Sequence, residues 1–164
     1  MASMTRLNRV WLISVVVRHP QKKTMDEITT ARYITDTFPG VETTDAFGYS
    51  FFFYGPDRML PFATLIAADN EHDRFSNLDR PGVFRLNIGV SKPTFQSLFG
   101  ADKVDASAYD FTTLDTIMPH PEYAAQHFVC VLNPIDATWT KVQALLAEAY
   151  DLAVRRHSKR QTPK

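Results

Sequence analysis

Hydrophobic and polar residues alternate most clearly between positions 83 and 90. The strand that this pattern predicts has one wholly apolar face, formed by Phe84, Leu86, Ile88 and Val90. Its other face carries Arg85 and Asn87. Burying either group without a partner would cost about 1–3 kcal/mol, so we expect the two side chains to pair inside the fold or to line a pocket.

Three further segments have the composition of strands. Residues 49–54 and 62–67 flank a turn signal, Gly55-Pro56-Asp57-Arg58, and predict a hairpin. Residues 127–133 predict the last strand. Pro81-Gly82 suits the middle of a type II turn that leads into the central strand. Short strands joined by turns, without long helices between them, indicate an antiparallel meander of about four to five strands.

Helical spacing marks both ends of this meander. A first helix is expected over residues 25–37, with Thr24 and Glu27 at capping-box spacing and Pro39-Gly40 at its end. Its predicted buried stripe consists of Ile28, Ala31, Ile34 and Phe38.

The other predicted helices follow the central strand. Ser91 caps a short helix that Gly100 ends, and one helical turn is expected at residues 112–118. Asp136 is expected to cap a long helix that reaches about residue 157. The predicted fold is therefore α+β, a two-layer sandwich in which the antiparallel meander packs against an N-terminal and a long C-terminal helix.

The distribution of charge divides the chain into three parts. Residues 1–24 and 155–164 each carry five basic and no acidic side chains, which leaves eight basic and 18 acidic side chains between them, a formal net charge of −10. An acidic body repels a phosphate backbone, so nucleic-acid binding would depend on the basic tails and is the weakest of our functional hypotheses. We expect a single domain over residues 25–157 and a disordered basic tail over 158–164.

Residues 1–24 are expected to be an extension of this domain. Their apolar run, residues 10–17, is too short to span a bilayer, which takes about 20 residues, and no cleavage site of a signal peptide follows it. An added edge strand is one interpretation, and we prefer the one in which Met25 is the natural start. No membrane association is expected, and the single cysteine, Cys130, favours a cytoplasmic location.

Several residues are candidates for chemistry. Arg85 and Asn87 could hold a carboxylate or phosphate, or Arg85 could form an internal ion pair with Asp79, its nearest acid in the sequence. His120, between two prolines, and His72, in a polar loop over residues 69–73, are the candidate catalytic groups.

The remaining motifs argue against cofactors. The loop at 69–80 begins like a calcium site but has Arg74 and Arg80 where glycine and glutamate are needed, so no metal site is expected. Cys130 has the sequence context of a small core residue. No glycine-rich nucleotide motif and no paired-cysteine zinc pattern occurs, so no cofactor is expected.

Five segments of the chain resemble a family of small bacterial proteins whose domain is of unknown function. They are residues 51–54, 61–64, 75–91, 118–121 and 129–134, of which 75–91, containing SNLDRPGVFRLNIGVS, is the most specific. The resemblance covers about residues 25–160 and implies no catalytic residues. Residues 145–156 are also similar to the last helix of YjbR-like proteins, which share a helix, a meander and a closing helix and have been described as DNA-binding.

Two functional hypotheses follow from these candidate residues. The first is a non-enzymatic binding module for a small anionic ligand or a protein partner, with Arg85, Asn87, Tyr54 and Asn77 as ligand-binding residues. The alternative is a cofactor-independent enzyme in which His72 or His120 acts as general acid/base and Arg85 stabilises an oxyanion. Exposed aromatic surface would also suit a homodimer. The enzyme hypothesis requires His72, Arg85, Asn87 and His120 to surround one cavity.

Overall fold

The computed structural model describes residues 25–56 and 58–162. Their helices are α1 (Glu27–Thr37), α2 (Lys92–Phe99) and α3 (Asp136–Gln161), with short 3-10 helices η1 (Ala106–Ala108) and η2 (Ala124–Gln126). The strands are β1 (Val41–Ala46), β2 (Tyr49–Tyr54), β3 (Ala63–Ile66), β4 (Arg85–Gly89), β5 (Met118–Pro119) and β6 (Phe128–Leu132). The predictions made for residues 1–24 lie outside the described residues.

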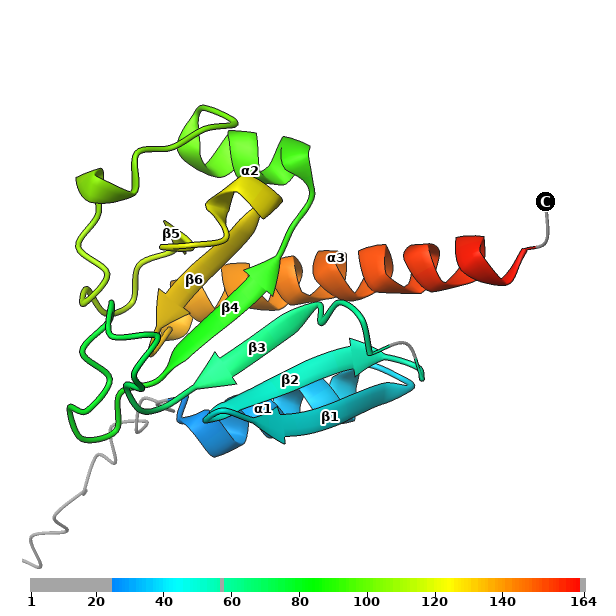
Figure 1. Cartoon of the computed structure of the whole chain (residues 1–164), viewed down its shortest axis with the longest axis horizontal. Helices are drawn as coiled ribbons and strands as arrows, with labels where there is room; N and C mark the ends of the chain where they lie inside the picture. Colours follow the sequence, from blue (N-terminus) through cyan, green and yellow to red (C-terminus); the bar gives the residue numbers. More distant parts are fainter. Residues whose placement is uncertain (1–24, 57, 163–164) are drawn as a thin grey trace, which may run out of the picture.

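The strands form one antiparallel sheet in the order β1-β2-β3-β4-β6-β5 (Figure 1). The predicted hairpin is confirmed, with Tyr49 opposite Ile66 and Phe52 opposite Ala63. The expected turn is also present, because Val83 N donates to Arg80 O at 3.2 Å and Gly82 has a φ of 71°. The α+β class is therefore confirmed, while the sheet has six strands and not four to five.

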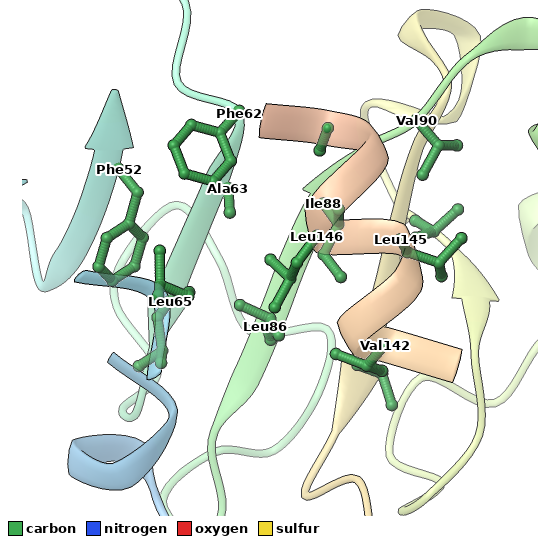
Figure 2. Packing of buried hydrophobic residues seen from close by; sticks show 14 of the residues in the cluster. Phe52, Phe62, Ala63, Leu65, Leu86, Ile88, Val90, Val142, Leu145 and Leu146 are labelled. Atoms are coloured by element: carbon green, nitrogen blue, oxygen red, sulfur yellow. The ribbon is translucent and has the colours of Figure 1, made fainter. Parts of the chain in front are cut away.

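Helices α1 and α3 cover the same face of the sheet (Figure 1). Figure 2 shows Leu86 and Ile88 of β4 beside Val142, Leu145 and Leu146 of α3. Burying each such side chain contributes roughly 1.5–3 kcal/mol, so this layer supplies most of the hydrophobic stabilisation. It comprises the apolar face that the sequence predicts for the central strand, together with Phe52, Phe62, Leu65, Val129 and Val131 of the neighbouring chain segments.

Helix α1 begins at Glu27, two residues after the predicted start at residue 25. Its N-cap is Asp26, whose Oδ1 accepts from Thr29 N at 2.6 Å, and Thr24 lies outside the described residues. Ile34 and Phe38 are buried as predicted, but Ile28 is 68% exposed and Thr30 is buried in its place. The buried face of the helix is thus rotated about the helix axis relative to the prediction, and the prediction that Ile28 is buried was wrong.

Helix α2 is confirmed, with Ser91 as N-cap and Gly100 as the left-handed C-cap. The helical turn predicted at 112–118 was wrong, because that segment leads into strand β5. Asp136 is the first residue of α3 and not its cap, which is Ile135. The helix continues to Gln161, so residues 158–161, predicted to belong to a disordered tail, are helical.

Candidate functional site

The sheet face opposite α1 and α3 carries the polar residues. Neighbouring strands place Phe51 opposite Thr64, Thr64 opposite Asn87, and Asn87 opposite Cys130. Residues that are directly opposite share a face, so this row runs along the helix-free side of the sheet. Arg85, two residues from Asn87 along β4, lies on the same side.

Arg85 is fully buried and forms an ion pair with Asp73. Its Nη1 donates to Asp73 Oδ1 at 3.1 Å and its Nη2 donates to Asp73 Oδ2. Nη1 also donates to Ser76 Oγ at 2.9 Å, and Nε donates to Asn87 Oδ1 at 3.0 Å. The partner proposed from the sequence, Asp79, instead accepts from Asp69 N at 3.2 Å. The guanidinium therefore directs four of its five N–H groups to other side chains of the protein.

The loop before β4 holds Asp73 in place. Asn70 Oδ1 accepts from His72 N at 2.8 Å and from Asp73 N at 2.9 Å, which turns the chain inward. Asp69 Oδ1 accepts from Leu78 N at 2.9 Å and closes the loop. The polar loop predicted over residues 69–73 is therefore not exposed throughout, because Asp73 is 3% exposed.

The charges of this pair are stabilised against their own desolvation. Burial disfavours the Asp73 carboxylate, but hydrogen bonds from Arg85 and Tyr49 outweigh it and lower the pKa of Asp73. Burial also disfavours the Arg85 cation, but Asp73 raises its pKa. Burial and the hydrogen bond that its hydroxyl donates to Asp73 raise the pKa of Tyr49. At neutral pH the site therefore contains a carboxylate, a guanidinium and a neutral phenol.

His120 follows β5 and is 4% exposed. Its Nδ1 accepts from the backbone N–H groups of Glu122 and Tyr123, both at 3.1 Å. Burial, together with the nearby Arg85 cation, lowers the pKa of His120 to about 3. The imidazole is therefore neutral at physiological pH, and because Nδ1 is an acceptor, its proton is on Nε2.

Cys130 lies beneath the same face. It is a free, fully buried thiol, and burial raises its pKa to about 12. Its Sγ donates to the carbonyl of Pro119 at 3.7 Å. A thiol that stays protonated is a poor nucleophile, so its prediction as a core residue is confirmed.

A cavity of about 470 Å³ opens on this face. Its apolar and aromatic lining consists of Phe47, Tyr49, Phe51, Leu60, Pro61, Tyr123 and Phe128. Its polar lining consists of Thr64, Asn70, His72, Asp73, Asn87, His120, Glu122 and Gln126. The lining is thus a wall of rings around a small number of buried polar groups, the composition typical of small-molecule sites.

The structure brings together only part of the predicted site. Asn87, His72 and His120 line the cavity, with His72 exposed at its mouth, whereas Arg85 lies behind the lining. Tyr54 is on the helix side of β2, where its ring packs against Tyr150 at 5.5 Å. Asn77 is an exposed loop residue and is absent from the cavity wall.

Sequence reasoning missed Tyr49, Thr64 and Asp73. The alternation along residues 49–54 contained a signal for the first, since Tyr49 shares its face with Phe51 and Phe53 and not with Tyr54. Thr64 becomes visible only through the register with Asn87. No sequence signal distinguishes Asp73 from Asp79 as the partner of Arg85.

A substitution at Gly89 tests the packing of Phe128, which lines the cavity. A Cβ built there would lie 2.9 Å from Cζ and 3.1 Å from Cε2 of Phe128, so Gly89→Ala must displace that ring. We expect a loss of about 1–3 kcal/mol in the free energy of unfolding, as for other overpacked sites. Chemical denaturation measures it. In a Phe128→Leu background the same substitution should be milder, and an equal loss in both backgrounds contradicts the explanation.

The described residues show neither a metal site nor a membrane helix. Within residues 25–56 and 58–162, no three His, Cys, Asp or Glu side chains are grouped so that they could hold a metal ion. In the same ranges no helix combines the length and the apolar character needed to cross a membrane.

These features define an α+β protein with an aromatic cavity above a buried ion pair. The chain belongs to a family of unknown function, DUF6194, whose sequence profile matches residues 23–162. This confirms the resemblance to an uncharacterised family, whereas the likeness to YjbR-like proteins has no support. Neither the curated proteins nor the solved structures contain a match to the chain.

Proposed function

We propose that the protein binds a small, ring-containing molecule in the cavity on the helix-free face of the sheet. The observation that carries the proposal is the cavity itself, about 470 Å³ within the 300–1,000 Å³ range of ligand sites, with rings on its walls. Phe51 and Phe128 supply flat apolar surface, and Asn87 and His120 supply oriented polar groups. A protein partner would need to insert an aromatic side chain at the same place.

The charges around the cavity favour an uncharged ligand over the anion expected from the sequence. Asp73 and Glu122 line the cavity, and Arg85, a buried cation nearby, is already paired. A bound anion would be close to two carboxylates, and the paired Arg85 would not offset their repulsion. The single, reduced cysteine supports a reducing, cytoplasmic setting for this binding.

Binding has more support than acid–base catalysis. A general base needs a free lone pair, but Nδ1 of His120 already accepts from two backbone N–H groups. Oxyanion stabilisation needs donors of Arg85 that reach the cavity, but Arg85 is absent from the lining and directs four of its five N–H groups to Asp73, Ser76 and Asn87. Nucleic-acid binding through the basic ends of the chain stays a prediction.

A fragment screen on the full chain tests the proposal. We expect two-ring aromatic compounds to raise the melting temperature, since a ligand at a hundred times its Kd adds about 2.7 kcal/mol. Leu60→Lys introduces a charged chain at the cavity mouth and should weaken each hit at least tenfold. Ile28→Lys replaces an exposed apolar residue on α1 and should leave binding unchanged. Equal loss in both variants, or the absence of hits, contradicts the proposal.

A further inference from the structure

The buried polar groups of the cavity floor have a fixed polarity. Arg85 has only donors, so its Nε bond of 3.0 Å requires the oxygen of the Asn87 amide to face it. The Asn87 Nδ2 group is therefore turned the other way, where it donates to Thr64 Oγ1 at 2.9 Å. Arg85 thereby sets the orientation of the Asn87 amide. Asn87 lines the cavity, whereas Arg85 is not part of the lining.

This orientation leaves hydrogen-bond donors without acceptors. The second N–H of Asn87 and the hydroxyl hydrogen of Thr64 find no acceptor among residues 25–56 and 58–162. The same holds in these ranges for Nε2–H of His120, whose Nδ1 is occupied. All three groups belong to residues that are at least nine-tenths buried and that line the cavity.

The buried carboxylate of the cavity, Asp73, already accepts hydrogen bonds from the protein. Both oxygens of Asp73 accept from Arg85, and Oδ2 also accepts from Tyr49. The groups at the cavity floor that need a hydrogen-bond partner are therefore donors. A buried donor without a partner costs about 1–3 kcal/mol. A ligand that brings an acceptor removes this penalty, and a ligand without one retains it.

We propose that the ligand presents a neutral carbonyl oxygen to the donors of Asn87, Thr64 and His120, with its rings against Phe51 and Phe128. This rests on the proposed function and specifies the ligand class as an aromatic ketone, amide, lactone or quinone. A carboxylate would offer acceptors too, but Asp73 and Glu122 oppose its charge. Arg85 acts as a positioning residue, because it orients Asn87 without reaching the cavity.

Three probes of similar size test the inference on the full chain. Benzophenone carries the carbonyl, diphenylmethane has a methylene in its place, and diphenylacetate carries an anionic acceptor. We expect benzophenone to bind at least tenfold more tightly than either of the others, as measured by titration of amide resonances. Equal affinity for benzophenone and diphenylmethane overturns the inference and leaves the proposed function intact. Tightest binding of diphenylacetate also overturns it, and failure of all three probes overturns both proposals.

A nearly isosteric variant identifies the groups responsible. Asn87→Asp keeps the acceptor for Arg85 but replaces the free donor with a carboxylate oxygen, so the preference for benzophenone should fall to twofold or less. Diphenylmethane should bind as before. His120→Asn keeps an acceptor for the two backbone N–H groups, withdraws the donor from the cavity and should lower the preference at least threefold. An undiminished preference in either folded variant contradicts the assignment.

Discussion

Replacing Asp73 by alanine is expected to lower the free energy of unfolding by about 3–5 kcal/mol. The substitution leaves the Arg85 guanidinium fully buried without its counter-ion, and it also removes the acceptor of the Tyr49 hydroxyl. Urea denaturation, monitored through the fluorescence of Trp139 on α3, measures the loss.

Two controls separate this effect from a general effect of loop mutations. Glu71→Ala removes an acid two residues away whose side chain is 81% exposed, and an exposed pair with His72 contributes about 0–1 kcal/mol. The double variant Asp73→Ala/Arg85→Met removes both charges and should recover part of the stability, because no unpaired ion remains. If Asp73→Ala costs no more than Glu71→Ala, the buried pair does not stabilise the fold.

The strands that the sequence predicts are those with a strong apolar face. Strands β2, β3, β4 and β6 each bury part of their length in the core, and their apolar composition is visible in the sequence. Strand β1, VETTDA, lies at the sheet edge with no fully buried residue, so it lacks the hydrophobic signal of a strand. Strand β5 has two residues, too few for any periodicity.

The candidate site was predictable in its centre but not in its surroundings. Arg85 and Asn87 stand out in the sequence because a charge and an amide interrupt an apolar strand. Both are buried and paired inside the fold, which was one of the two alternatives predicted for them. Their partners come from a loop whose course depends on Asn70 and Asp69 side chains bonding to backbone N–H groups. Such local bonds leave no periodic trace in a sequence, so nothing in the pattern predicts that Asp73 is buried.

Lowering the pH from neutral is expected to destabilise the protein before its carboxylates titrate. The pKa of His120 is about 3 in the folded chain and near 6.5 when unfolded, so between these values only the unfolded chain binds the proton. The contribution of His120 to stability is therefore complete above about pH 6.5 and falls as the pH decreases toward 3, by a total on the order of 5 kcal/mol. Arg85 and Asp73 are the charged groups that face this imidazole; Arg85 opposes its protonation and Asp73 partly offsets that.

Asp73 contributes in a different pH range. Its pKa is below 3.8 in the folded chain, so its stabilisation is present above that value and is lost only as the pH falls through the folded pKa. The pKa values of Asp26, Asp105 and Asp110 are lowered as well, so their contributions also disappear below about pH 4. The interval from about pH 6.5 to 4 therefore reports mainly on His120.

Urea denaturation at a series of pH values tests this assignment with two histidine variants. His120→Asn retains a side-chain acceptor for the backbone N–H groups of Glu122 and Tyr123 but removes the titrating ring, so it should flatten the profile between pH 6.5 and 4. His72→Asn is the matched control, because its side chain is 87% exposed and folding does not desolvate it, and it should retain the slope. A slope that survives in His120→Asn, or disappears in His72→Asn, shows that the buried imidazole is not the group that couples folding to pH.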